Sequence, residues 1–472
     1  MPDASSPERP IETLADAAAW LEGLINVERL PDLPYRRLGL APIRRLVARL
    51  GNPHDGLSVV HIAGSKGKGS TALLTEALLG AAGERVGTFT SPHLERWTER
   101  FRIGGVEVED AQLAAAVSRL RPHVEALRAE DPANAPTFFD ATTAAALLLF
   151  AGAGIDRVVL EVGLGGRLDS TNVVEPAVTC ITTIELEHTD RLGATVAAIA
   201  AEKAGILKAG RPLVLGALPP AAEVVVLARA EALGVPVTRL GRELDAALRG
   251  PATLDGLALS LRDGAFAVDA TLPVLGAHQA ASAALALACV RRLAAHDDAA
   301  LAAAVVRGFA GARLPGRVER VGRAPWLVVD AAHTAASAAA LAAALACVPR
   351  AAVHLVLSVS AGKDLPAILA ALLPLATCVT VTRAEPARSL APDEIAAAAR
   401  AVAPGVAMRV VPNPHLALRT ARESAAAEDL VIATGSVYLA GIARRIWSEP
   451  PAPVPVSRRP ATPSGVGTPR PS

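Results

Sequence analysis

Short apolar runs alternate with longer Ala- and Leu-rich stretches along most of this 472-residue chain. Each apolar run is rich in Val, Ile or Leu and ends in polar residues or glycine, as buried strands do. The stretches between the runs favour helix, because Ala has the highest intrinsic helix propensity. This alternation predicts an α/β protein built on parallel sheets.

The predicted strands form two series. They cover 57–63, 85–90, 156–162, 177–185 and 211–215, and then 326–330, 351–358, 378–382, 408–411 and 429–434. Residues 217–275 are less regular and predict a small β insertion. Gly, Arg and Pro cluster at 311–315, so we predict one domain over 1–312 and a smaller one over 313–447. Residues 448–472 are rich in Pro, Ser, Thr and Arg and are predicted to be a disordered tail.

Composition excludes several classes of protein. Lys plus Arg number 47 and Asp plus Glu number 46, so the chain lacks the basic excess that nucleic-acid binding requires. No apolar run reaches the roughly 18 residues of a membrane span, and the first ten residues do not resemble a signal peptide. The four scattered cysteines suit a reducing compartment. We therefore expect a cytoplasmic monomer without nucleic-acid or membrane partners.

A glycine-rich segment, GSKGKGST at 64–71, lies between the first strand and a helix expected to begin near Ser70. Its glycines let successive backbone amides point at phosphate oxygens, and the helix N-terminus adds partial positive charge. Lys68 is placed to reach a terminal phosphate, and Ser70 or Thr71 could bind Mg²⁺. The spacing differs from the standard phosphate loop by one glycine after Lys68. A simple solvated turn is disfavoured by the strand-to-helix context.

Polar side chains follow three strands of the first series at their carboxyl ends. Ser91 follows the second strand, Glu161 ends the third, and Glu187 and His188 follow the fourth. Because such strand ends line one crevice in an open α/β sheet, these groups should converge beside the phosphate loop. Oxygen and imidazole ligands there suit Mg²⁺. Ordinary structural roles are also open to them, such as an ion pair between Glu161 and Arg167.

Three further residues are candidates for chemistry. Lys203 lies on the helix after the fourth strand and is either structural or chemically modified. Arg317 lies at the domain junction, where a guanidinium could reach phosphates across a cleft. Asp330 ends a strand, where a carboxylate could bind a ribose, although it could equally cap the following helix.

Taken together, these motifs resemble the folylpolyglutamate synthase and dihydrofolate synthase family of the Mur ligase superfamily. The resemblance runs from about residue 35 to 441 and rests mainly on EVGLGGRLD at 161–169 and EKAGI at 202–206. It implies an N-terminal P-loop ATPase domain with a parallel sheet and a smaller, Rossmann-like C-terminal α/β domain. It also implies a ligase that uses ATP and two Mg²⁺ ions to join L-glutamate to the carboxylate of folate or dihydropteroate, through an acyl phosphate.

The resemblance also implies roles for individual residues. It assigns nucleotide binding to Gly64, Gly67, Lys68, Gly69, Ser70, Thr71, Ser282, Arg317, Asp330 and His333. It assigns metal binding to Ser70, Ser91, Glu161 and His188. It assigns the pterin-bearing substrate to Phe139, Asp140, Ala141, Thr142, Leu168, Asp169 and Ser170. It assigns catalysis to Lys68, His188, Lys203 and Arg317, with Lys203 carbamylated.

Several positions depart from the family pattern, and at two of them, Ser282 and Thr334, Asn is usual. These departures motivate a second hypothesis, a nucleotide-binding protein without ligase activity. A monofunctional folylpolyglutamate synthase and a Mur-type ligase for a different acceptor are also compatible with the general pattern. The presence of Lys68, Glu161 and Lys203 favours an active ligase, and we expect it to use both folate and dihydropteroate.

Overall fold

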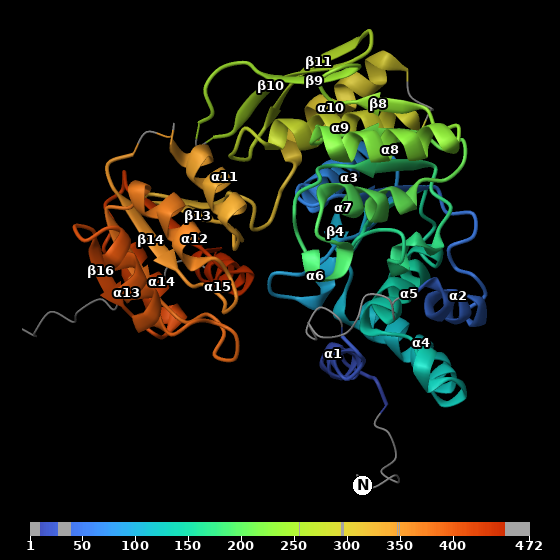
Figure 1. Ribbon diagram of the computed structural model, residues 1–472, viewed down its shortest axis with the longest axis horizontal. Coiled ribbons are helices and arrows are strands. Elements are labelled where there is room, and N and C mark those ends of the chain that lie inside the picture. Colours follow the sequence, from blue (N-terminus) through green and yellow to red (C-terminus); the bar gives the residue numbers. More distant parts are fainter. Residues whose placement is uncertain are drawn as a thin grey trace, which may run out of the picture.

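The computed structural model describes residues 10–26, 39–253, 255–293, 297–346, 348 and 350–448. The disordered tail is predicted over 448–472; Ser448 instead ends a helix, and the rest of the predicted tail lies outside this range. Figure 1 shows two bodies, each a sheet covered by helices, with the chain passing from the first (blue to yellow) to the second (orange to red). Within the described residues, no helix is long and apolar enough to cross a membrane.

The larger sheet has eight strands in the order β4-β3-β2-β5-β1-β6-β7-β8. Its parallel strands are β1 Val59–Ala63, β2 Val86–Phe89, β5 Arg157–Glu161, β6 Val178–Ile181, β7 Leu213–Leu215 and β8 Val237–Arg239. Two short antiparallel strands, β3 Phe101–Ile103 and β4 Val106–Glu107, extend one edge. The five predicted strands are therefore confirmed, and the structure adds β3, β4 and β8.

Helices cover both faces of this sheet. One face packs on α3 Lys68–Ala81, α9 Gln279–Arg292 and α10 Asp298–Gly311. Much of the other packs on α1 Leu14–Glu22, α2 Leu40–Arg49, α4 Asp110–Glu130 and α5 Phe138–Ala151, and its far end on α7 Val196–Lys203 and α8 Pro220–Ala232. Shorter elements are η2 Trp97–Arg100, η3 Pro132–Asn134, η4 Ser170–Val173, α6 Thr189–Leu192 and η5 Ala204–Ile206.

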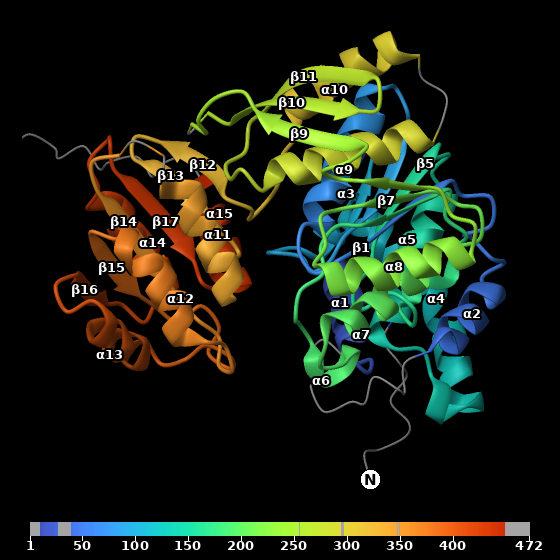
Figure 2. The same cartoon turned by 45° about the horizontal axis from the view of Figure 1, so that its top comes forward.

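The predicted β insertion is a three-stranded antiparallel sheet of β9 Leu244–Leu248, β10 Leu257–Asp263 and β11 Phe266–Leu272. Alternate residues of β10 and β11 are buried, and these pack with α9 and α10 in one apolar core. In Figure 2 this sheet lies over those helices. The insertion is smaller than the predicted 217–275, because α8 and β8 belong to the main sheet.

The C-terminal body has a six-stranded sheet in the order β12-β13-β17-β14-β15-β16. Its strands are β12 Glu319–Arg323, β13 Trp326–Val329, β14 Val353–Leu357, β15 Cys378–Val381, β16 Ala407–Val410 and β17 Leu430–Thr434. Its helices are α11 Ala335–Ala346, α12 Leu365–Leu372, η6 Leu373–Leu375, α13 Pro392–Val402, α14 Pro414–Glu423 and α15 Val437–Ser448. All five predicted strands are present, and β12 adds an antiparallel edge.

The two bodies touch at several places, among them a loop of the first body and the β insertion. The loop after β2 packs on the C-terminal body, where Cβ atoms at Gly316 and Gly441 would lie only 2.8 Å and 2.5 Å from Leu94. The insertion makes the second contact, because Asp255 accepts hydrogen bonds from Arg320 and Arg323 at 2.8 and 2.7 Å. These contacts bring the start of the C-terminal body to the carboxyl ends of the larger sheet.

Candidate active site

The glycine-rich loop joins β1 to α3, and the helix begins at Lys68, two residues before the predicted start. Gly67 precedes it with a φ of +83°, a left-handed conformation that glycine adopts without strain. The first amides of a helix have no partner within the helix, so those of Lys68, Gly69 and Ser70 are suited to an anion. Local geometry therefore agrees with a phosphate-binding loop.

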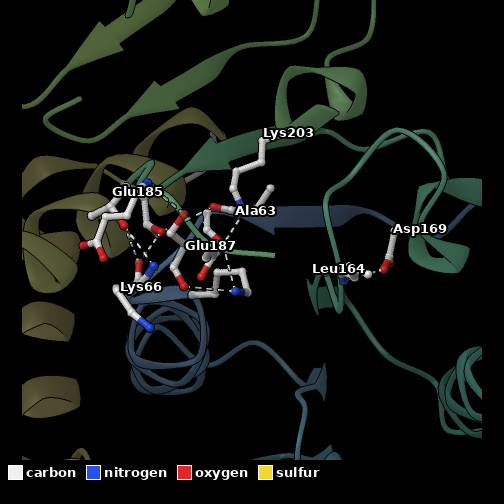
Figure 3. Close-up of polar contacts among 12 residues, drawn as sticks. Ala63, Lys66, Leu164, Asp169, Glu185, Glu187 and Lys203 are labelled. Atoms are coloured by element: carbon white, nitrogen blue, oxygen red, sulfur yellow. Dashed lines mark hydrogen bonds and ion pairs between the residues drawn. The ribbon is translucent and has the colours of Figure 1, made fainter. Parts of the chain in front are cut away.

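Hydroxyl residues that follow β6 hold the first half of this loop (Figure 3). Thr183 accepts hydrogen bonds from the amides of Ser65, through its carbonyl at 2.8 Å, and of Lys66, through Oγ1 at 2.9 Å. Thr182 Oγ1 donates to the Lys66 carbonyl at 2.6 Å. The sequence interpretation missed both threonines, because nothing in their spacing connects them to a loop more than a hundred residues earlier.

Lys68 folds back over its own loop. Its Nζ donates to the carbonyl of Gly64 at 2.8 Å and to that of Ser65 at 3.4 Å. The Lys68 ammonium group thus lies against the first two residues of the glycine-rich loop. The predicted contact between Lys68 and a terminal phosphate remains a prediction.

Glu161 and Ser91 meet at the carboxyl ends of β5 and β2. Glu161 is buried, and its Oε2 accepts a hydrogen bond from the Ser91 amide at 3.1 Å. Burial raises the pKa of Glu161, while the charges of Lys68 and Arg317 oppose that rise. Arg167, the other candidate partner for Glu161, pairs with Glu202 at 2.8 Å.

Arg317 reaches this place from the beginning of the C-terminal body. A Cβ added to Gly69 would overlap the Arg317 guanidinium and would lie 3.2 Å from Glu161 Oε2. Ser282, at the start of α9, is near as well, because its Oγ lies 3.5 Å from the position of a Cβ on Gly67. The fold therefore gathers the phosphate loop, one carboxylate and an arginine from the second body.

The buried Lys203 forms an ion pair with the half-buried Glu187 (Figure 3). Lys203 is 2% exposed, and its Nζ donates to Glu187 Oε1 at 3.0 Å. Burial, together with the nearby charge of Lys68, lowers the pKa of Lys203 to about 8. His188 is exposed and begins α6 with a φ of +47°.

The segments predicted to hold the pterin-bearing substrate meet at two buried carboxylates. Asp140 accepts hydrogen bonds from Thr137 Oγ1 and from Ser170 Oγ, both at 2.7 Å. Asp169 accepts from the amides of Leu164 at 2.9 Å and Thr171 at 3.0 Å. Burial raises the pKa of both carboxyls, that of Asp169 to about 6.

The remaining residues of these two segments differ in exposure. Phe139 and Leu168 are half-buried, and the Phe139 ring lies 5.9 Å from that of Phe89. Ala141 and Thr142 are fully buried in α5. The assignment of Ala141 and Thr142 to the substrate remains a prediction.

Asp330 and His333 form a tight turn after β13. The two oxygens of Asp330 accept hydrogen bonds from the amides of Val318 at 2.7 Å and Ala332 at 2.8 Å. His333 Nδ1 donates to the Ala331 carbonyl at 2.8 Å, which leaves Nε2 as its acceptor atom. Asp330 thus joins the turn that carries Arg317 to the turn that carries His333, and its contact with a ribose remains a prediction.

The candidate metal ligands are of donor types that suit Mg²⁺, and their assignment remains a prediction. Ser70, Ser91, Glu161 and His188 supply two hydroxyls, one carboxylate and one imidazole. Among the residues that the structure describes, no three His, Cys, Asp or Glu side chains gather into a metal cluster. An ion here would take its remaining ligands from phosphate and water, as Mg²⁺ usually does. The buried Glu161 carboxylate is a group that such a cation would stabilise.

Comparison with known proteins identifies the family of this chain. The Mur ligase middle domain matches residues 62–290, and the Mur ligase, glutamate ligase domain matches residues 316–437. The dihydrofolate synthase/folylpolyglutamate synthase of Mycobacterium tuberculosis is 36% identical and covers 95% of this chain and 98% of its own. Two archaeal relatives, both probable bifunctional folylpolyglutamate synthase/dihydropteroate synthases, are longer, and the chain spans about half of each.

Solved structures give the same result. A Mycobacterium tuberculosis folylpolyglutamate synthase complexed with ADP superposes with a TM-score of 0.82 at 35% identity, covering 93% of this chain and 99% of that one. A bifunctional folylpolyglutamate synthase/dihydrofolate synthase with Mn, AMPPNP and L-glutamate bound has a TM-score of 0.76 at 31% identity, covering 92% and 98%. This chain therefore belongs to the folylpolyglutamate synthase/dihydrofolate synthase family of Mur ligases, which are ATP-dependent glutamate ligases.

Proposed function

We propose that this enzyme uses ATP to join L-glutamate to the carboxylate of reduced folates and of dihydropteroate, through an acyl phosphate, with release of ADP and phosphate. The observation that carries the proposal is the position of Arg317, which reaches from the second body to Gly69 of the phosphate loop beside Glu161. A carboxylate is a poor electrophile, and phosphorylation gives it a leaving group. Arg317, Lys68 and the loop amides are placed to offset charge on the transferring phosphoryl group.

The metal proposal follows from the same place. Glu161, with the Ser70 and Ser91 hydroxyls and His188, would hold divalent ions, which supply charge neutralisation to the phosphates when bound. Relatives support a divalent cation, because one of their structures contains Mn together with AMPPNP. We propose Mg²⁺, in two sites, as the ions that this chain uses.

Lys203 is the second part of the metal proposal. Its pKa of about 8 leaves part of the amine neutral near pH 7, and a neutral amine can add CO₂ to give a carbamate and a proton. The carbamate would be an anion close to Glu187, now 3.0 Å from Nζ, so a cation between the two would be required. A carbamylated Lys203 is therefore consistent with a metal ion beside it.

The acceptor would lie against the buried carboxylates Asp140 and Asp169 and the aromatic ring of Phe139. Relatives bear names that combine both activities, which favours both acceptors here. We propose that the enzyme works as a monomer in the cytoplasm, a reducing compartment that the four scattered cysteines suit.

The test is ATP turnover with Mg²⁺ and L-glutamate, in the presence of dihydropteroate, tetrahydrofolate or no acceptor. Phosphate release and a product heavier by one glutamate with both acceptors would support the proposal. Turnover with tetrahydrofolate alone would restrict the enzyme to polyglutamylation. Nucleotide binding without turnover on either acceptor would contradict the proposed function and would point to Ser282 and Thr334.

A further inference from the structure

A fully buried histidine lies in the middle of β1, outside the groups assigned to the reaction. His61 is 0% exposed, and burial lowers its pKa to about 3, so the ring is neutral. Its Nε2 lies 2.8 Å from Thr171 Oγ1, and Thr171 Oγ1 also forms a short hydrogen bond to Asp169 Oδ1. Three side chains therefore form one chain of hydrogen bonds that leads from the central strand to the proposed acceptor site.

The direction of these hydrogen bonds follows from their chemistry. An ionised Asp169 can only accept, so the Thr171 hydroxyl donates to it and must itself accept from His61. This fixes the hydrogen of the His61 ring on Nε2. The other ring nitrogen, Nδ1, has no hydrogen-bond partner within the described part of the chain.

This arrangement is an unfavourable way to fill a core. A buried nitrogen without a partner destabilises the folded protein, and an apolar side chain of similar size would avoid that loss. The partners in register with His61 on the two neighbouring strands, Leu160 and Thr179, show that apolar and small residues fit beside it. Its one hydrogen bond, to Thr171, is therefore the feature that distinguishes His61 from an ordinary core residue.

The position of Thr171 explains what that hydrogen bond does. Thr171 lies in η4, which Asp169 caps, and the neighbouring Ser170 donates to Asp140 at 2.7 Å. Holding Thr171 in place thus holds both carboxylates of the site.

We infer that His61 is a positioning residue for the pteridine-bearing acceptor, acting through Thr171 on Asp169. This inference rests on the proposed function and deepens it, because it names a determinant of acceptor affinity that does not touch the acceptor. ATP binds elsewhere, at the loop that follows β1, so His61 should leave nucleotide affinity unchanged.

The experiment compares three variants by their KM values for dihydropteroate and ATP and by kcat. H61L removes the donor and keeps the bulk, whereas H61Q keeps an N–H close to the position of Nε2. T179V is the matched control, because Thr179 is in register with His61 and its hydroxyl donates to the Pro212 carbonyl at 3.2 Å, away from Asp169. H61L should raise the KM for dihydropteroate about tenfold, the effect of roughly one hydrogen bond, with KM for ATP within about twofold.

H61Q should restore the KM for dihydropteroate to within about threefold of wild type, and T179V should leave it unchanged. An unchanged KM for dihydropteroate in H61L, an equal rise in KM for ATP, or an H61Q as impaired as H61L would each overturn the inference. If H61L fails to fold, T171V removes the hydrogen bond to His61 from its other end, together with the one from Thr171 to Asp169, and T171S should restore both.

Direct binding separates this inference from the proposed function. Calorimetric titration of dihydropteroate in the presence of AMPPNP measures acceptor affinity without turnover. A wild type that binds dihydropteroate but forms no product would overturn the proposed function, and a weaker H61L would still support positioning. A wild type that binds no dihydropteroate would overturn both.

Discussion

At the scale of single residues, the site is built from charged groups that the fold removes from water. Lys203 and Glu161 are both buried, and each has an altered pKa because burial disfavours its charged form. Burial lowers the pKa of Lys203 and raises the pKa of Glu161, and in both cases it favours the neutral form. Lys203 becomes a better nucleophile toward CO₂, and Glu161 becomes a site at which a cation is stabilised.

Lys203 tests the carbamate directly. We expect K203A to lower kcat by at least about 100-fold, because the site would lose the anionic group that we propose binds the metal. K203R should be equally impaired, since a guanidinium stays charged and forms no carbamate. Stopped assays in CO₂-depleted buffer, with and without added bicarbonate, check the same point on the wild type. A K203R enzyme with normal turnover would contradict the carbamate.

Glu161 tests the metal site. E161Q keeps the shape and can still accept from the Ser91 amide, but it loses the charge. We expect a higher Mg²⁺ concentration for half-maximal activity and a kcat at least about tenfold lower. E202Q is the control, because Glu202 pairs with the exposed Arg167 instead. Equal Mg²⁺ dependence in E161Q and E202Q would place the metal elsewhere.

The sequence predicts the role of a residue when that role follows from its neighbours along the chain. It does not predict a role that arises from a contact with a distant segment. The phosphate loop and Glu161 follow from a glycine pattern and from the end of an apolar run. Thr182 and Thr183 support that loop only because β6 lies beside β1 in the sheet. His61 was missed because one histidine inside an apolar strand looks like a core residue, and only the sheet shows which hydroxyl it meets.

At the scale of elements, the first turn of α3 lies against the side chain of Arg317 from the C-terminal body. Gly69 is in this first turn, and its missing side chain leaves room for Arg317. Gly80, near the other end of the same helix, is exposed and has no atom within 4 Å of its potential Cβ. The same substitution at the two positions therefore separates helix propensity from the contact with Arg317.

G69A should raise the KM for ATP about tenfold or more, because the new methyl group displaces the Arg317 guanidinium. G80A should keep normal kinetics and gain up to about 1 kcal/mol of stability, since alanine favours helix over glycine. Steady-state kinetics and thermal unfolding of both variants check these outcomes. Normal ATP affinity in G69A would show that Arg317 is not needed at this position.

The elements that the sequence pattern missed have a common cause. β3 and β4 are only three and two residues long, and β12 is half-exposed, so none has an apolar run that a pattern could detect. β4 and β12 are edge strands with one neighbour each, and β3 lies next to the edge between β2 and β4. The central strands are buried on both faces, and their continuous apolar runs made them predictable.

At the scale of the whole molecule, one buried carboxyl links the site to overall stability. Asp330 joins the turn before β12 to the turn after β13 through two amides. Burial raises its pKa from 3.8 to about 6. The folded protein therefore holds a proton between about pH 4 and 6 that the unfolded chain releases, and stability from this group is lost as the pH rises through 6.

D330N removes that titration. We compare the free energies of unfolding of wild type and D330N as a difference, wild type minus variant. This difference should fall by up to about 3 kcal/mol between pH 4 and 7, because the pKa of Asp330 is raised by about two units. Urea unfolding of both proteins across this range measures the difference. The remaining buried carboxyls, Asp169 among them, are present in both proteins and cancel. A difference that is constant with pH would contradict the raised pKa of Asp330.

The meeting of Arg317 with Gly69 also has a mechanical consequence. Each body has its own apolar core, and the two are joined mainly by a loop, a surface ion-pair cluster and this one guanidinium. A nucleotide bound between the two bodies would hold them together. On heating, we expect the two bodies to unfold in two steps without nucleotide and in a single step with nucleotide bound. Pulling on the two ends of the protein should then reveal one rupture event with AMPPNP present and two without it.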